Sequence, residues 1–197
     1  LRKPVVYVPG DNEWTDCHRT NNGSMDPLER LSHLRKVMFP DTRSLGQSTM
    51  PLEHQAGLGQ PYVENTRFRQ GPVVFATFNL PGSNNNHIAT PQQCRSKSKR
   101  PQADCDNAET EYLARDAANL AWLKDTFSQA KASKALGVVM VVQAEPGFDL
   151  PETEEVDESL SVEVSGYRSF MKEVTHQTAH FNGQVLFAHG HMHVFKI

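Results

Sequence analysis

The chain has 197 residues, a hydrophobic fraction of 38% and a formal net charge of −3, which suits one domain with a real core over residues 1–197. The slight negative charge predicts no large basic surface and argues against nucleic acid as a partner. No apolar run approaches the roughly 20 residues that cross a bilayer, so a membrane partner is not expected either.

The first third of the sequence predicts a strand and a helix. The β-branched run at residues 4–8 precedes a Pro-Gly pair, which is typical of a buried strand that ends in a turn. Apolar residues recur at helical spacing over residues 27–39, and Asp26 is a suitable N-cap for that helix. A proline follows and ends the helix, and residues 41–61 are expected to form a polar loop.

The middle of the chain predicts a hairpin, a polar loop and a long helix. Residues 62–68 and 73–80 flank a Gln-Gly-Pro turn and are expected to pair as strands. Residues 81–107 are polar and predict a loop. A helix is expected over residues 108–132, and its predicted apolar face consists of Tyr112, Leu113, Ala117, Leu120, Leu123 and Phe127.

The last third predicts two more strands and a helix. The run at residues 137–142 is wholly apolar, as in strands that are covered on both faces. An acidic surface segment at residues 151–161 precedes a helix over residues 167–181, and another buried strand is expected over residues 185–188. The resulting order of strand, helix, hairpin, helix, strand, helix and strand is an α/β arrangement.

Cys94 and Cys105 bracket a short polar, basic loop, while Cys17 stands apart. A disulfide would close this loop if the protein is exported to an oxidising compartment. Two free thiols on the loop are an equal alternative, because spacing alone cannot decide. The sequence leaves the compartment open, and the possible disulfide is the one feature that favours a secreted or periplasmic protein.

Polar clusters follow three of the predicted apolar strands. They are Asp-Asn-Glu at residues 11–13, Gln-Ala-Glu at residues 143–145, and the histidine-rich segment at residues 189–193. Ligands of open α/β sheets bind beyond the ends of the strands. We therefore expect the three clusters to contribute to one shared site.

The histidine-rich segment carries His189, His191 and His193 at alternate positions. On an extended chain these side chains would point to one side, and neutral imidazole is a common metal ligand. Gly190 would let the backbone turn tightly around an ion. A surface cluster of histidines without function is the alternative.

Asp11 and Asn12 supply oxygens that suit ions such as Mn, Fe or Zn, and carboxylates can bridge two ions. The alternative for this segment is a simple turn, because Gly, Asp and Asn are common turn residues.

Together these motifs resemble those of the calcineurin-like metallophosphoesterases. Residues 190–193, Gly-His-Met-His, match the last motif of that family, Gly-His-x-His, in full. Residues 10–13, Gly-Asp-Asn-Glu, are similar to the third motif, Gly-Asn-His-(Glu/Asp), and one branch of the family reads Gly-Asp-Asn-Glu-Trp there. The segments LRKVMFP, SLG, YVEN, PGSNNN, WLKDTF and QAEP also resemble that branch, so the resemblance covers nearly the whole chain.

The resemblance implies a metallophosphoesterase-type β-sandwich flanked by helices. It also implies hydrolysis of phosphomonoesters or phosphodiesters by a water that two divalent ions (Mn, Fe or Zn) activate. Position by position, the implied metal ligands are Asp11, Gln143, His191 and His193. His189 is additional to the motif and has no implied role.

Asn12 and His191 are the implied catalytic residues. Asn12 stands where the family has a histidine that contacts phosphate, and an amide cannot replace imidazolium as a general acid. Asn79 and Asn85 are candidate donors to a substrate phosphate, with support of the site or formation of a turn as the simpler alternatives.

The first two motifs of the family, which include the bridging aspartate, are not found in the sequence. We therefore expect a domain that is incomplete at its N-terminus. The alternatives to a phosphoesterase are an inactive fragment or pseudoenzyme that keeps part of the metal site, and a metal-binding or sugar-binding module without hydrolytic activity.

Overall fold

The computed structural model describes residues 1–95, 97–147, 165–191 and 193, so the predicted acidic segment at residues 151–161 lies outside the described residues. The α-helices are α1 (Pro27–Met38), α2 (Gly82–Asn85), α3 (Pro91–Arg95), α4 (Gln102–Ala132) and α5 (Arg168–Ala179), and the 3-10 helices are η1 (Thr15–His18) and η2 (Thr20–Asn22). The strands are β1 (Glu53–His54), β2 (Thr66–Gln70), β3 (Val73–Thr77), β4 (Gly137–Val141) and β5 (Gln184–Ala188).

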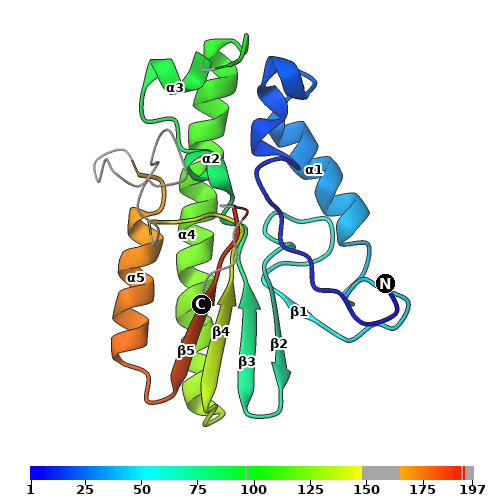
Figure 1. Ribbon diagram of the computed structural model, residues 1–197, viewed down its shortest axis with the longest axis vertical. Helices are drawn as coiled ribbons and strands as arrows, with labels where there is room; N and C mark the ends of the chain where they lie inside the picture. The colour runs from blue at the N-terminus through cyan, green and yellow to red at the C-terminus, as the bar shows by residue number, and fades with distance from the viewer. Residues whose placement is uncertain (96, 148–164, 192, 194–197) are drawn as a thin grey trace.

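The strands form one open five-stranded sheet in the order β1-β2-β3-β4-β5 (Figure 1). β1, β2 and β3 pair antiparallel, as the predicted hairpin requires, while β3, β4 and β5 pair parallel. The α/β prediction is confirmed in this coarse form. The described residues make a single mixed sheet rather than the two stacked sheets of a β-sandwich.

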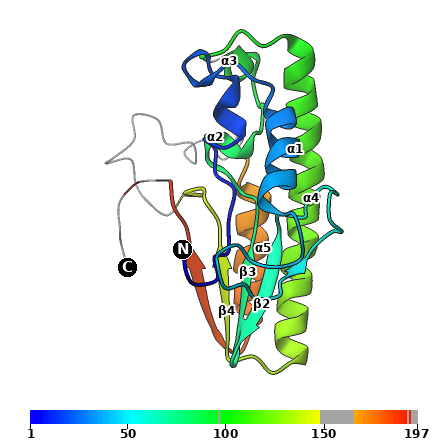
Figure 2. The same cartoon turned by 90° about the vertical axis from the view of Figure 1, so that its right-hand side faces the viewer.

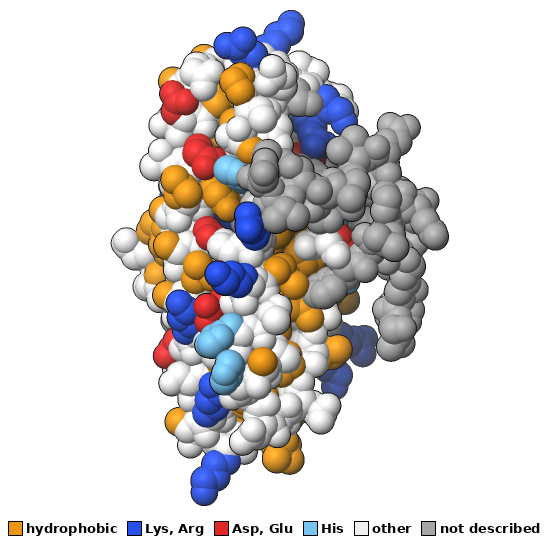
Figure 3. Space-filling view, turned by 90° about the vertical axis from the view of Figure 1, so that its left-hand side faces the viewer, with side chains coloured by type: hydrophobic (Ala, Val, Ile, Leu, Met, Phe, Trp, Pro, Cys, Tyr) orange, Lys and Arg blue, Asp and Glu red, His pale blue; other side chains and the backbone are white. Residues whose placement is uncertain are grey.

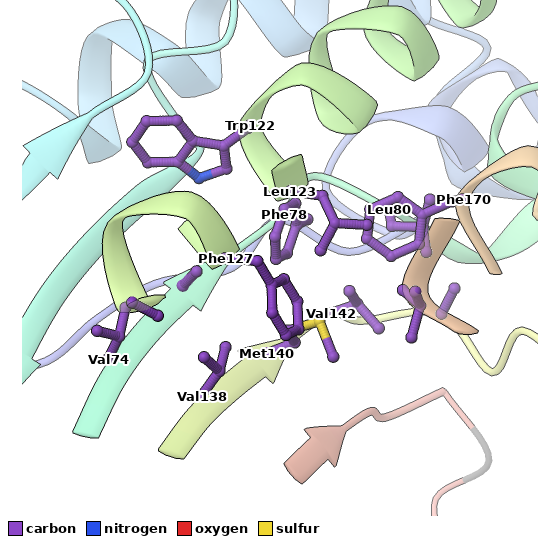
Figure 4. Close-up of a cluster of buried hydrophobic side chains, with 14 of the residues drawn as sticks. Val74, Phe78, Leu80, Trp122, Leu123, Phe127, Val138, Met140, Val142 and Phe170 are labelled. Carbon is purple, nitrogen blue, oxygen red and sulfur yellow. The ribbon is translucent and has the colours of Figure 1, made fainter. Parts of the chain in front are cut away.

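The main core lies between the sheet and helices α4 and α5, which cover the same face (Figure 2). Figure 4 shows Phe127 of α4 close to Val138 and Met140 of β4, and all three side chains are buried. Full burial of one such side chain contributes about 1.5–3 kcal/mol. Among the described residues, no helix is long and apolar enough to cross a membrane.

Helix α1 begins where the sequence predicts. Asp26 accepts a hydrogen bond from the backbone N–H of Leu28 over 3.0 Å, and Pro27 occupies the first turn. Leu31 and Leu34 are buried, and Leu34 packs in a second, smaller cluster with Phe39 and Val63. The helix ends at Met38, two residues before the proline.

The strand predicted over residues 4–8 is wrong. Val5 makes only an isolated antiparallel bridge with Leu45, with N–O distances of 2.8 and 2.9 Å. The run is β-branched, but it lies beside a loop rather than beside a strand of the sheet. Strand propensity reflects the packing and pairing that a segment finds, and this segment finds one bridge.

Helix α4 is longer than predicted, and its predicted apolar face is partly wrong. Leu113 is 60% exposed, whereas Arg115, Asn119 and Thr126 are buried. Arg115 and Asn119 are buried because they donate hydrogen bonds to a buried backbone carbonyl of the chain after β3. The backbone carbonyl of Asn79 accepts hydrogen bonds from Arg115 Nη1 over 2.9 Å and from Asn119 Nδ2 over 3.0 Å.

Arg115 is the centre of a buried polar network. Its Nε donates to Glu111 Oε1 over 2.6 Å, and its Nη2 donates to the backbone carbonyl of Asn85 over 2.8 Å. The guanidinium lies 5.1 Å from the centre of the Trp14 ring. A buried charge is tolerated only when it is paired and hydrogen-bonded in this way.

We predict that Arg115→Ala lowers the free energy of unfolding by roughly 3–5 kcal/mol, because it leaves buried acceptors unpaired. Arg115→Lys keeps the charge but not the fork of donors, so an intermediate loss is expected. Urea unfolding measures both effects. The control is Lys124→Ala, which removes an exposed ion pair with Glu173 and should change stability by less than about 0.5 kcal/mol. Equal losses of stability for Arg115→Ala and the control would contradict the role of Arg115 as the centre of the buried network.

Cys94 and Cys105 form a disulfide, with their Cα atoms 5.5 Å apart, and Cys17 is a buried free thiol. The bond joins α3 to the first turn of α4. Of the two alternatives that the spacing allowed, the structure has the disulfide.

We predict that the denatured, unreduced protein exposes one reactive thiol, that of Cys17, and that reduction exposes three. Loss of this short cross-link in a Cys94→Ala/Cys105→Ala variant should cost about 3 kcal/mol, because the unfolded chain gains freedom. Thiol titration in denaturant, combined with urea unfolding of the variant, measures both values. Three reactive thiols before reduction would rule the disulfide out.

Candidate functional site

One residue from each of the three predicted polar clusters, Asp11, Gln143 and His191, lies at one end of the sheet. Asp11 Oδ2 lies 3.1 Å from His191 Nε2, although the residues are 180 positions apart. Gln143 Nε2 donates to Asp11 Oδ1 over 3.1 Å across a separation of 132 positions. Asp11 is buried, and His191 remains partly exposed. These three side chains form the candidate site, with Asp11 in contact with the other two.

The parallel strands determine this meeting point. Gln143 follows β4 and His191 follows β5, and the carboxyl ends of parallel strands lie at the same edge of a sheet (Figure 1). The backbone N–H of Gly190 donates to the Gln143 carbonyl over 3.1 Å. The backbone N–H of Gly82, in the loop after β3, donates to Gln143 Oε1 over 2.6 Å. Both atoms of the Gln143 amide are therefore used in orienting its neighbours.

A tight turn holds the Asp11 carboxylate in place. The backbone carbonyl of Asp11 accepts hydrogen bonds from the N–H groups of Trp14 and Asp16, at the start of η1. The N–H of Asn12 donates to Asp11 Oδ1 over 2.9 Å. Burial raises the pKa of Asp11, but the hydrogen bond and charge of His191 and the backbone N–H donors outweigh it. The net pKa of Asp11 is lowered, so it is a carboxylate at neutral pH.

Asp16, Arg19 and Ser83 form a second polar group beside Asp11. Arg19 Nη1 lies 2.6 Å from Asp16 Oδ2, and Arg19 Nη2 donates to Ser83 Oγ over 3.0 Å. Burial raises the pKa of Asp16, against the lowering effects of Ser83 and Arg19. The sequence prediction missed Asp16 and Arg19. The one signal that could have indicated them is their proximity to Asp11 in the sequence.

The loop after β3 approaches the site in an unusual conformation. Ser83, Asn84, Asn85 and Asn86 have φ angles of 54°, 54°, 57° and 60°, in the left-handed region that non-glycine residues seldom occupy. Asn85 N donates to the Tyr167 hydroxyl over 3.2 Å, and Gly166 N donates to Asn84 Oδ1 over 2.7 Å. Strained backbone of this kind persists only where surrounding contacts hold it.

The remaining predicted site residues lie in different surroundings. Asn12 is exposed at the rim, next to Asp11, and His193 is exposed. Asn79 and Asn85 are fully buried, and their side chains donate to Glu64 Oε1 and to the Gly166 carbonyl, respectively. This arrangement fits the simpler alternative for both asparagines, which is support of the loop beneath the site. His189 is exposed and lies 6.3 Å from the Phe187 ring.

Among the described residues, no group of three or more His, Cys, Asp or Glu side chains is arranged to hold a metal ion. Asp11 and His191 are two such donors, and the Gln143 amide is a third polar group, which contacts Asp11. Comparison with protein families, with curated proteins and with solved structures finds no match for this chain. Its function is therefore inferred from the residues of the site.

We predict that Gly82→Ala disturbs the site, because an added methyl carbon would lie 2.5 Å from His191 Nε2 and 2.8 Å from Asp11 Oδ2. The substitution should separate these side chains and cost about 1–3 kcal/mol of unfolding free energy. Histidine NMR signals and urea unfolding report the two effects. Gly57→Ala is the control, since its nearest atom would be 3.9 Å away. An unchanged His191 signal in Gly82→Ala would contradict the close approach.

Proposed function

We propose that this chain carries part of the centre of a metal-dependent phosphoesterase that hydrolyses phosphomonoesters or phosphodiesters. The observation that carries the proposal is the 3.1 Å contact between Asp11 and His191. These residues belong to motifs near opposite ends of the sequence. Gln143, which belongs to a third motif, contacts Asp11 as well.

The donors present suit a divalent ion. Carboxylate and imidazole are ligands for Mn, Fe and Zn. Asp11 Oδ2 and His191 Nε2, which lie 3.1 Å apart, are the two atoms that would hold the ion. Because the pKa of Asp11 is lowered, its carboxylate is charged at neutral pH and can bind a cation. The set fits one ion directly, and the second ion of the proposal would need His193 and further ligands.

In the proposed reaction, an ion at this position would lower the pKa of a bound water and polarise the phosphoryl oxygen. Asp11 and His191 would hold the ion, while Gln143 keeps the Asp11 carboxylate oriented through its Nε2–H. Asn12 is exposed beside Asp11, where its side-chain amide could donate to a phosphoryl oxygen. The β-sandwich implied by the family resemblance is part of this proposal.

A pseudoenzyme that keeps only part of the metal site is the second candidate. The observation that favours it is the use of both Gln143 amide atoms in internal hydrogen bonds, with Gly82 and with Asp11. An amide that is engaged in this way is a poorer metal ligand than the imidazole that the family has at this position. This candidate predicts uptake of metal without turnover.

We predict that the purified chain retains Mn, Fe or Zn after removal of excess metal, and that it hydrolyses a bis-nitrophenyl or mono-nitrophenyl phosphate. Asp11→Ala and His191→Ala should each lower metal affinity at least about tenfold, because each removes a ligand. Mass spectrometry of bound metal and the two hydrolysis assays measure these effects, and His33→Ala, on the exposed side of α1, is the control.

The outcomes separate the candidates. Bound metal that is lost in His191→Ala, together with turnover, supports the phosphoesterase, whereas the same metal behaviour without turnover supports the pseudoenzyme. Equal metal content in His191→Ala and His33→Ala would exclude both.

A further inference from the structure

Helix α5 and its C-cap residue carry two histidines that play no part in the candidate site. His176 and His180 are one helical turn apart at the C-terminal end of the helix, and both are exposed. Their ring centres are 4.5 Å apart. Figure 3 faces the side of the molecule on which α5 lies and shows histidine side chains at the surface. Two imidazoles this close to each other can reach one ligand.

The orientation of the His180 ring is determined by its backbone contact. His180 Nδ1 lies 2.7 Å from the carbonyl oxygen of His176. A carbonyl only accepts hydrogen bonds, so Nδ1 carries the proton and donates it. The neutral ring then has its lone pair on Nε2. Metal-ligating histidines commonly donate their other N–H to a backbone carbonyl in the same way, which orients the ring and raises its basicity.

We propose that His176 and His180 bind one transition-metal ion of the Ni²⁺, Cu²⁺ or Zn²⁺ class, with His180 binding through Nε2. Imidazole selects these ions over Mg²⁺ and Ca²⁺, which prefer oxygen ligands. The partial negative charge at the C-terminal end of a helix also favours a cation there. Both side chains are exposed, so the ion keeps water at its other coordination positions.

This site is separate from the candidate site at the other end of the sheet. α5 ends at Ala179 and β5 begins at Gln184, whereas His191 follows the far end of β5. Five residues of strand span about 17 Å. Metal binding on α5 therefore does not depend on the proposed phosphoesterase, and each can fail without the other.

The test is isothermal titration of the full chain with Ni²⁺, and every variant carries His191→Asn so that the candidate site is silenced. His176→Ala leaves the backbone carbonyl that orients His180 in place and removes one imidazole only. His180→Ala removes the other imidazole, and both positions are exposed, so the fold should be unchanged by circular dichroism. His33→Ala is the matched control, because it removes an exposed helical histidine that has no second histidine one turn away.

The expected result is one Ni²⁺ bound to the His191→Asn parent, with affinity at least about tenfold weaker in either α5 variant and unchanged in His33→Ala. In the Cu²⁺-loaded parent, electron paramagnetic resonance should show two nitrogen ligands, and one in each α5 variant. Equal Ni²⁺ affinity in His176→Ala, His180→Ala and the parent would overturn the proposal, as would the absence of Ni²⁺ binding by the parent.

Discussion

The surroundings of the candidate site depend on the hydrogen bonds of the buried Arg115 guanidinium. A charge that water does not reach must be matched by nearby acceptors, and Arg115 finds them in Glu111, Asn79 and Asn85. Two of these acceptors belong to the chain that leaves β3, which Arg115 therefore ties to the long helix α4. The left-handed run at residues 83–86 can persist because this network and Tyr167 hold it.

The site follows from that loop and from the direction of the strands. Parallel pairing brings the segments after β4 and β5 together, and the loop after β3 reaches them through the Gly82 N–H. Gly82 in this loop lies so close to Asp11 and His191 that an added side chain would displace one of them. The same crowding keeps Asp11 buried, and the donors around it keep it charged. Close packing and an ionised carboxylate are thus parts of one arrangement.

Local signals in the sequence predicted much of this fold. The Asp26 cap located the start of α1, and the apolar runs located β3, β4 and β5. Predictions failed where a distant partner decides the outcome. Leu113 was expected in the core and is exposed, because Arg115 and Asn119 take the buried face of α4 to pair with the chain after β3. Helical periodicity cannot show that a polar side chain has buried partners elsewhere.

For the candidate site too, local signals were sufficient for some residues, while others depend on distant partners. The proximity of Asp11, Gln143 and His191 was predictable, since each follows an apolar run of the sequence. Asp16 and Arg19 were missed, because their place beside the site depends on the turn of η1 and on Ser83, which is 67 residues from Asp16. The run at residues 4–8 predicted a strand before Asp11, and Asp11 reaches the site without one.

The sequence of β4 is wholly apolar, but helices α4 and α5 cover only one of its two faces. Val138 and Met140 face α4, whereas Val139 lies in a row with Phe68, Phe75 and Leu186 across the sheet. Leu186 in this row is 58% exposed, and the rings of Phe68 and Phe75 stack 4.8 Å apart. Parallel strands are normally covered on both faces, and α4 and α5 cover only one. This row is therefore a partly exposed apolar strip on the face of the sheet opposite α4 and α5.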